Sequence, residues 1–201
     1  MNTVHTAELI APSYPSLIRA SLGLTLISLG LCGFLYSAAA TGLGQLLFPQ
    51  QANGSLIERD GQVLGSSLVG QPFHAAQYFQ GRPSAANYDP MLMAGSNLAR
   101  TNPALSKMIE QRIVAIEDQD QVKRHQIPSD LVTASASGID PEISVQSAML
   151  QVKRIAKQRT LSEQQLIELI QQHTTKPTFG LLGQPRIHVL KLNLALDQIS
   201  K

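Results

Sequence analysis

The sequence predicts an α+β protein with one N-terminal transmembrane helix followed by a single mixed α/β soluble domain. Three observations predict it: an uncharged apolar stretch near the N-terminus, a hairpin signal soon after it, and helical patterns in the second half. Strands that precede and follow a group of helices are typical of the α+β class. A length of 201 residues fits one domain with an appendage.

The first element is an apolar stretch between Arg19 and Glu58, a range that contains no charged residue. A helix needs about 20 apolar residues to cross the roughly 30 Å hydrocarbon core of a bilayer. We therefore divide the chain into a short tail at 1–19, a transmembrane helix at 20–47, a linker at 48–54 and an extramembrane domain at 55–201.

A cleaved signal peptide is the alternative interpretation of this stretch. The segment 37–40, Ser-Ala-Ala-Ala, offers a small-residue cleavage site. However, the apolar region of a signal peptide is usually about 7–15 residues long, and this one is longer and begins late. The anchored interpretation is therefore favoured.

The flanking charges indicate an orientation. Arg19 lies at the N-terminal end of the span, whereas the first Lys or Arg beyond it is Arg59. Cationic residues collect on the cytoplasmic side of spans. The sequence thus predicts a cytoplasmic N-terminus and a body on the exported side. Cys32 is the single cysteine and lies inside the span, which excludes a disulfide scaffold.

Composition and motifs exclude several classes of function. Beyond the span the chain has 15 basic and 13 acidic residues, a balance that does not predict a nucleic-acid surface. The sequence contains no phosphate-binding P-loop and no G-x-S-x-G nucleophile motif. Its five histidines are scattered without metal-ligand spacing. We therefore expect no catalytic residue, no metal site and no firmly bound cofactor.

A hairpin begins the body. Asp60-Gly61 separates two apolar runs at 55–59 and 62–69, and a two-residue turn of this type needs positive φ at both central positions. The following range, 71–100, is rich in Pro, Gly, Asn and aromatic residues and has no clean period. We predict an ordered loop region there, and long loops of this kind are usually functional.

Three helices are predicted next. Asn102 caps the first, with proline at its first helical position, and this helix ends before Pro128. The second is predicted to begin at Asp140-Pro141 and to carry an apolar stripe from Val145 to Ala156. The third begins at Ser162, which forms a capping box with the glutamine three residues later.

The C-terminal run has two interpretations. Leu190, Leu192, Leu194 and Leu196 alternate with other residues, which is strand spacing. The same tail also fits a helical turn.

The serine-rich stretch VTASASGIDP, residues 132–141, also has more than one interpretation. In the first, Asp140 caps the following helix and Gly138 permits the turn before it. In the second, Ser135, Ser137 and Gly138 offer O–H and N–H donors to a nucleotide phosphate. Asp140 would repel a phosphate, which favours the cap. Contact with a partner protein is the third interpretation.

The long loop region contains candidate partner contacts. Arg82 can bind a carboxylate with both arms of its guanidinium group, and Pro83 stiffens the chain beside it. The alternative for Arg82 is an internal salt bridge with Asp89 or a bond to a backbone carbonyl. We assign Tyr88 to an interface and Phe79 to the core.

Further candidates lie in the loop region and in the span. Asn97 belongs to the same contact region, where it is expected to fix a turn. Gly23 and Gly30 are seven residues apart, which places them on one helix face and allows close packing against a partner helix. Glycine is also simply frequent in transmembrane helices.

Several blocks, taken together, resemble one known family. The blocks are NGSLI, DGQVLGSSLVGQPF, YFQGRPSAANYDP, AGSNLARTNPAL, IPSDLVTASASGIDP, LQVKRIAKQR and LLGQPRIHVLKLNLALD. With the single span before them, they resemble the C subunit of the bacterial potassium-transporting Kdp P-type ATPase. The chain departs from the family pattern at Ala136, where the family has glycine, and at Gln184 and His188.

The resemblance implies a function. Complexes of this family import K⁺ at the expense of ATP, with a channel-like subunit that selects K⁺ and a P-type pump subunit that hydrolyses ATP. The C subunit would be a non-catalytic accessory subunit in the bacterial inner membrane. It would support assembly and act as a catalytic chaperone that raises the ATP affinity of the pump subunit.

The predicted orientation bears on whether this chain can contact ATP. If the body is exported, the serine-rich loop cannot touch cytosolic ATP, and any effect on ATP affinity must pass through the membrane subunits as a coupling between states. ATP would then act only through the complex. The alternative function is a stand-alone membrane-anchored binding module in the periplasm, and an anchored hydrolase is the third hypothesis.

Overall fold

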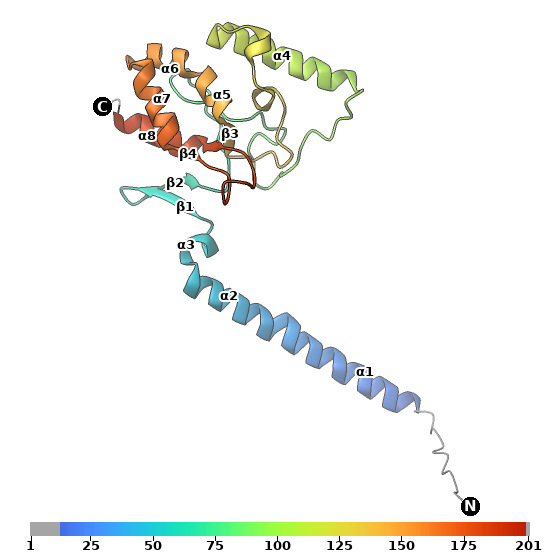
Figure 1. Cartoon of the computed structure of the whole chain (residues 1–201). Helices are drawn as coiled ribbons and strands as arrows, with labels where there is room; N and C mark the ends of the chain where they lie inside the picture. Colours follow the sequence, from blue (N-terminus) through green and yellow to red (C-terminus); the bar gives the residue numbers. More distant parts are fainter. Residues whose placement is uncertain (1–12, 200–201) are drawn as a thin grey trace, which may run out of the picture. The chain divides into compact units, whose positions relative to one another are not determined.

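The computed structural model describes residues 13–199, and these fall into two compact units, 13–53 and 54–199 (Figure 1). The first unit is a long apolar helix with a short extension, and the second mixes helices with short strands. This confirms the predicted fold class. Of the predicted tail at 1–19, residues 1–12 lie outside the described range.

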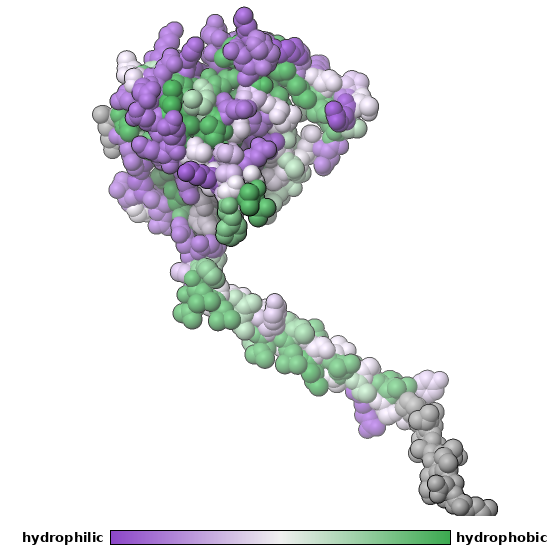
Figure 2. Space-filling view, viewed as in Figure 1, coloured by the Kyte–Doolittle hydropathy of each residue, from purple (hydrophilic) through white to green (hydrophobic). Residues whose placement is uncertain are grey.

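The N-terminal unit contains the candidate membrane span. Helix α1 (Tyr14–Ser28), the π-helical segment η1 (Leu29–Leu35) and helix α2 (Tyr36–Leu47) form one continuous apolar helix of 34 residues. Its surface is mostly hydrophobic, with a hydrophilic patch near the N-terminal end (Figure 2). The helix starts six residues before the predicted range at 20–47, and a short helix, α3 (Pro49–Ala52), lies in the predicted linker.

The second unit opens with the predicted hairpin. Strand β1 (Leu56–Arg59) pairs antiparallel with β2 (Gln62–Ser66), with Arg59 opposite Gln62. Asp60 and Gly61 both have positive φ, 53° and 75°, as a two-residue turn of this type requires. From residue 67 to residue 102 the chain forms neither helix nor strand, which confirms the predicted loop region.

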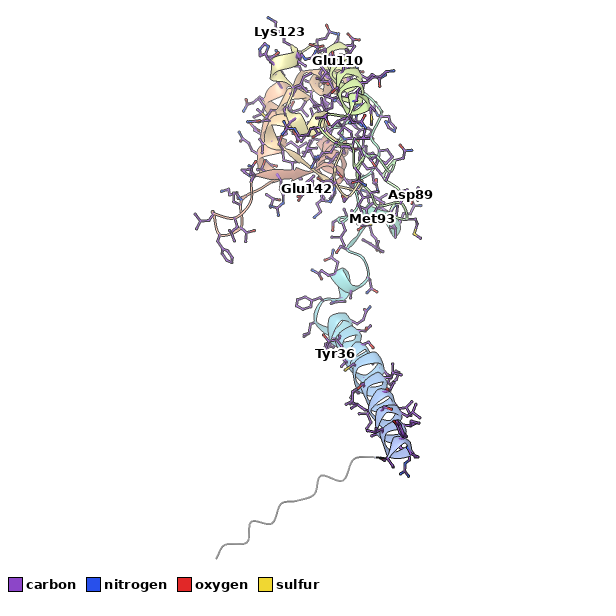
Figure 3. All side chains as sticks on the ribbon, turned by 90° about the vertical axis from the view of Figure 1, so that its right-hand side faces the viewer. Tyr36, Asp89, Met93, Glu110, Lys123 and Glu142 are labelled. Atoms are coloured by element: carbon purple, nitrogen blue, oxygen red, sulfur yellow. The ribbon has the colours of Figure 1, made fainter. Side chains whose placement is uncertain are left out.

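Helix α4 (Pro103–Asp120) begins where the sequence predicts. The Asn102 side chain accepts a hydrogen bond from the Ala104 N–H at 2.9 Å. Among its apolar residues only Ile113 is fully buried, so α4 lies at the edge of the domain (Figures 1 and 3). Two short 3₁₀ turns follow it, at Arg124–Gln126 and Ser129–Leu131.

The predicted start of the second helix, at Asp140-Pro141, is wrong. Strand β3 (Glu142–Ser144) occupies this position, and helix α5 (Val145–Leu150) begins only after it, capped by the Ser144 hydroxyl, which accepts from the Ser147 N–H. After a break at Gln151 the chain continues as α6 (Val152–Arg159). Pairing with another strand holds residues 142–144 extended and outweighs the local helix signal.

Helix α7 (Glu163–Gln172) carries the predicted capping box. Strands β4 (Thr174–Thr175) and β5 (Arg186–His188) complete a three-stranded antiparallel sheet in the order β3-β5-β4.

Of the two interpretations of the C-terminal leucine run, the helical one is confirmed and the strand is wrong, because these residues form helix α8 (Val189–Ile199). Val189, Leu192 and Leu196, three and four residues apart, lie on one buried face of α8, which is why the run is helical.

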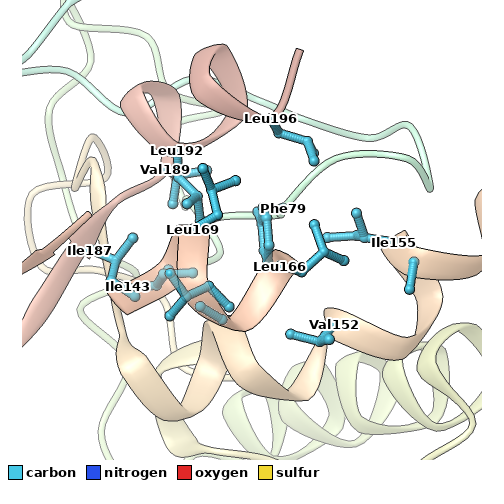
Figure 4. Close-up of a cluster of buried hydrophobic side chains, with 13 residues drawn as sticks. Phe79, Ile143, Val152, Ile155, Leu166, Leu169, Ile187, Val189, Leu192 and Leu196 are labelled. Atoms are coloured by element: carbon cyan, nitrogen blue, oxygen red, sulfur yellow. The ribbon is translucent and has the colours of Figure 1, made fainter. Parts of the chain in front are cut away.

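One hydrophobic core holds the second unit together, drawn in Figure 4. Helices α5, α6, α7 and α8 and the three-stranded sheet contribute to it. Phe79, from the loop region, is completely buried in this core, as predicted. The core thus fixes one point of an otherwise irregular loop, and that point positions the residues discussed next.

Candidate functional site

The loop region is held to the helices by buried polar side chains, and Arg154 is the most connected of them. Its guanidinium forms an ion pair with Asp120 at the end of α4, with 2.7 Å between Nε and Oδ1. It also donates to the backbone carbonyls of Ala76 and Tyr78 and to the Gln151 side chain. Both charged side chains are only 4% exposed. One side chain therefore joins α4, α6 and the loop region.

Two amides hold the next residues of the loop. The Asn193 side chain of α8 accepts from the Phe79 N–H and donates to the Phe79 carbonyl, both at 2.9 Å. The Gln151 side chain bonds the Gln80 N–H and carbonyl in the same way, at 2.8 and 3.1 Å. Each amide replaces the partner that a neighbouring strand would supply, so the extended loop has satisfied backbone groups without a sheet.

The serine-rich stretch is a turn held by hydrogen bonds between its own residues. The buried Ser135 hydroxyl accepts from the Gly138 N–H at 2.8 Å, and the Ser137 hydroxyl accepts from the Ile139 N–H at 3.2 Å. The Ser135 N–H donates to the Pro83 carbonyl at 3.0 Å. The N–H groups of Ser135, Gly138 and Ile139 therefore have partners within the domain.

Gly138 is required by both its backbone and its surroundings. Its φ is +73°, and a Cβ atom added there would lie 2.6 Å from the Ala94 carbonyl oxygen and 2.9 Å from the Ala86 Cβ. Its own carbonyl accepts from the Ser84 hydroxyl. The glycine thus lets the serine-rich stretch and the loop region approach each other closely.

Asp140 pairs with Arg82 instead of capping a helix. Their side chains form an ion pair with 3.0 Å between the Arg82 nitrogen and Oδ2. The other carboxylate oxygen accepts from the Glu142 N–H at 3.0 Å. Arg82 therefore makes an internal salt bridge, but with Asp140 and not with Asp89. Its buried Nε has no hydrogen-bond partner among residues 13–199.

Tyr88 and Pro83 line a cavity of about 220 Å³ between the loop region and α4. Tyr88 is half-buried and donates its hydroxyl hydrogen bond to the Arg82 carbonyl. Burial raises the pKa of the Tyr88 hydroxyl, and burial lowers the pKa of the nearby Arg112 guanidinium. Arg112 also donates to the Val132 carbonyl at 2.9 Å, which ties α4 to the serine-rich stretch.

The remaining candidates are Asn97 and two glycines of the apolar helix. Asn97 has a φ of +51° and an exposed side chain, in the same loop region as Arg82 and Tyr88. Gly23 and Gly30 lie in the apolar helix, and a Cβ atom added at either would meet nothing within 4 Å. No contact inside the described chain therefore requires glycine at these two positions.

The sequence named some of these residues as separate candidates and missed others. Arg82, Pro83, Tyr88, Ser135 and Gly138 lie in one connected region, although the sequence separates them by about 50 residues. The residues that organise this region were missed, namely Gln151, Arg154 and Asn193. A signal exists: each lies within or beside an apolar stripe, where a polar side chain is expected to have a buried partner.

Ligand chemistry is sparse in the described part of the chain. Residues 13–199 contain no group of three or more His, Cys, Asp or Glu side chains placed to hold a metal ion. The geometry shows side chains that fix a loop surface over a compact core. The fold and this surface define a class: a membrane-anchored protein with one extramembrane α+β domain.

Comparisons with known proteins identify the family. Residues 18–198 match the family model described as K⁺-transporting ATPase, c chain. The potassium-transporting ATPase KdpC subunit of Methylibium petroleiphilum is 52% identical, over 90% of this chain and 97% of its own length. The namesake subunits of Xanthomonas campestris and Shewanella putrefaciens are 50% and 47% identical, over 90% and 92% of this chain and 87% and 90% of theirs.

The chain belongs to the family of potassium-transporting ATPase C subunits. It is therefore a membrane subunit of a potassium-transport complex, and the resemblance noted in the sequence is confirmed.

Proposed function

We propose that this chain is a non-catalytic accessory subunit that supports assembly of the ATPase and raises the ATP affinity of its pump subunit. Its partners would be a channel-like, potassium-selecting subunit and a P-type pump subunit. The observation that carries the proposal is the family match across residues 18–198, because the match covers the span and the body together. An anchored body whose buried polar side chains fix a loop surface suits a role in contact and coupling.

The serine-rich stretch supports a role that does not include direct nucleotide binding. The N–H groups of Gly138 and Ile139 already donate to serine hydroxyls, and a phosphate would have to displace those bonds. The Asp140 carboxylate beside them would repel an anion. We propose that Ser135, Ser137 and Gly138 shape the surface that Arg82 belongs to, and that ATP acts only through the complex.

We also propose the orientation that the flanking charges favour, with the N-terminus in the cytoplasm and the body in the periplasm. An effect on ATP affinity would then be a coupling free energy between two states of the complex, typically about 1–3 kcal/mol, or roughly 5–150-fold in affinity. The body would supply that energy by contacting one state of the membrane subunits better than the other.

The test is the potassium-dependent ATPase activity of the complex purified with and without this chain. We expect loss of the chain either to separate the remaining subunits or to raise the ATP concentration needed for half-maximal activity. Unchanged assembly together with an unchanged ATP dependence of the ATPase activity would refute the proposal. Isolated chain in nanodiscs is expected not to bind a fluorescent ATP analogue, and saturable binding would restore the direct nucleotide hypothesis.

Topology is tested with single cysteines in a Cys32→Ser background. Ser106→Cys on α4 reports on the body, and Ser13→Cys reports on the start of the apolar helix; both positions are exposed. In intact cells a membrane-impermeant thiol reagent is expected to label position 106 and not position 13. Labelling of position 13 alone would reverse the orientation.

A further inference from the structure

An exposed apolar loop connects β4 to β5. Its tip contains Phe179, Leu181 and Leu182, whose exposed fractions are 90%, 86% and 64%. The loop projects from the domain in Figure 3, and hydrophobic side chains gather at the lower edge of the domain in Figure 2. Large apolar side chains presented together on a tip are costly in water and mark a site of contact.

The loop backbone is ordered, so the tip is presented in a fixed shape. The Thr178 N–H donates to the Leu182 carbonyl at 2.8 Å, and the Leu182 N–H donates back to the Thr178 carbonyl at 3.0 Å. Phe179 has a φ of +54°, a conformation that a bulky residue rarely adopts. With Gly180, whose φ is +73°, Phe179 forms the turn at the tip of the loop.

The charges nearest the tip along the chain are basic, although Arg186 is ion-paired with Glu142 of the neighbouring strand β3. From residue 169 to residue 196 the sequence has no Asp or Glu, whereas it has Lys176, Arg186 and Lys191. Lys176 is exposed and comes three residues before Phe179. An apolar tip beside cations matches the surface of an anionic bilayer, where apolar side chains enter the headgroup boundary and cations bind the headgroups.

The linker keeps the domain close to a bilayer. Helix α2 ends at Leu47 and the domain begins at Gly54, so the six residues 48–53 connect them. Fully extended, the seven Cα–Cα steps from Leu47 to Gly54 span at most about 25 Å, and α3 shortens this reach. A tethered apolar tip meets the lipid surface at high effective concentration, so even a small insertion is favoured.

A second apolar loop lies at the same end of the domain. Met91 and Met93, with exposed fractions of 87% and 59%, belong to the loop region. Figure 3 places Met93 at the end of the domain away from α4, on the opposite side from the β4–β5 loop. Two apolar points separated across one end of a domain suit a flat, continuous surface.

We propose that the β4–β5 loop is a membrane-contact loop whose tip enters the interface of the bilayer that holds the chain's own span. The occupant is lipid, and Lys176 contacts anionic headgroups. The contact would fix the angle of the body over the membrane and thereby the surface that the body offers to its partners. This inference needs only the membrane anchor and does not rest on the proposed effect on ATP affinity.

The experiment uses the full chain in vesicles of equal parts phosphatidylcholine and phosphatidylglycerol. In a Cys32→Ser background, an environment-sensitive fluorophore is attached at Leu182→Cys, and lipids with a nitroxide on the acyl chain act as quenchers. The control is Ser106→Cys on α4, which Figures 1 and 3 place at the other end of the domain. Native Cys32, labelled in the unsubstituted chain, verifies insertion of the span.

We expect lipid quenching at position 182 to be at least about threefold stronger than at position 106, because interfacial side chains lie about 5–10 Å deep. Replacing the neighbours, Phe179→Ser with Leu181→Ser, is expected to abolish the difference. Lys176→Gln should lower the ratio of inserted to free loop about fivefold, since one cation near an anionic surface contributes that much. Lys153→Gln, an exposed lysine on α6, should change nothing.

Two outcomes overturn the proposal. In the first, lipid quenching at position 182 is no stronger than at position 106, and aqueous iodide quenches position 182 in both the isolated chain and the assembled ATPase. The loop is then exposed to water and contacts neither lipid nor a partner. If iodide reaches position 182 in the isolated chain but not in the assembled ATPase, and lipid quenching stays low, a partner subunit covers the loop instead of lipid.

Discussion

Replacing Arg154 with methionine should destabilise the domain more than any change on its surface. The side chain joins α4, α6 and the loop region through an ion pair with Asp120 and two backbone carbonyls. Methionine keeps much of the apolar volume but leaves the Asp120 charge buried without its partner. Removing one member of a buried ion pair costs about 3–5 kcal/mol. We take about 4 kcal/mol, a large part of the roughly 5–15 kcal/mol that stabilises a typical domain.

The assay is urea unfolding of the full chain in detergent, followed by circular dichroism, because the sequence has no tryptophan. With a slope of about 2 kcal/mol per molar urea, the midpoint should fall by about 2 M. The control is Arg124→Met, which breaks the exposed ion pair with Glu110 and should leave the midpoint unchanged. In the double variant Arg154→Met with Asp120→Leu, much of the loss should return, because no unpaired charge remains.

A midpoint for Arg154→Met that matches the Arg124→Met control would refute this reasoning. It would mean that water reaches Asp120 once the guanidinium is gone, so that the loop region does not depend on this ion pair. A double variant that is less stable than Arg154→Met alone would refute the charge argument specifically. It would leave the hydrogen bonds to the loop as the main contribution of Arg154.

Three further predictions use the same unfolding assay. Gly138→Ala should lower the free energy of unfolding by about 1–3 kcal/mol more than Gly180→Ala does. Both glycines have a φ of +73°, but only at Gly138 would the new Cβ meet neighbouring atoms. Equal losses of stability would contradict the packing argument. Asn193→Leu should lower the free energy of unfolding by about 2–4 kcal/mol, because it leaves the buried N–H and carbonyl of Phe79 unpaired. A loss near zero would show that water replaces the amide. Burial lowers the pKa of His188, so the folded state binds fewer protons than the unfolded state. Stability should therefore decrease as pH falls below about 6.5. His188→Gln should remove this dependence of stability on pH.

Local chemistry made part of the fold predictable from sequence. The caps at Asn102 and Ser162 and the turn at Asp60-Gly61 form where predicted, because each depends on atoms within three residues. The apolar span is predictable for a similar reason, since composition and length alone decide it.

The errors arise where distant residues decide the structure. Asp140-Pro141 carries a local helix signal, yet Asp140 pairs with Arg82 and residues 142–144 pair with β5. In the C-terminal run, leucines at every second position also include pairs four apart, such as Leu192 and Leu196. Packing against the core selects the helix, and one sequence cannot show that packing.

The candidate site shows the same division. The glycine at position 138 was identifiable because a serine-rich turn before an Asp-Pro needs a flexible residue. The partners of Arg82 and Tyr88 were not, because the first lies 58 residues away and the second is a backbone carbonyl. Whether these residues also contact another subunit remains a prediction, and the internal bonds of Arg82 do not exclude it, since its side chain is still 26% exposed.

The buried polar contacts bear on how an accessory subunit can influence a pump. A body that couples to one state of its partners must present a surface of fixed shape, because a surface that adapts to both states binds both and shifts neither. Residues 67–102 have no sheet or helix to fix them, so Arg154, Gln151 and Asn193 supply that rigidity. If the chain raises ATP affinity as proposed, loosening one of these contacts, with Asn193→Ser for example, should weaken that effect before it unfolds the body. A variant in which stability falls while the ATP dependence of the complex stays constant would argue that the loop region is not the coupling surface.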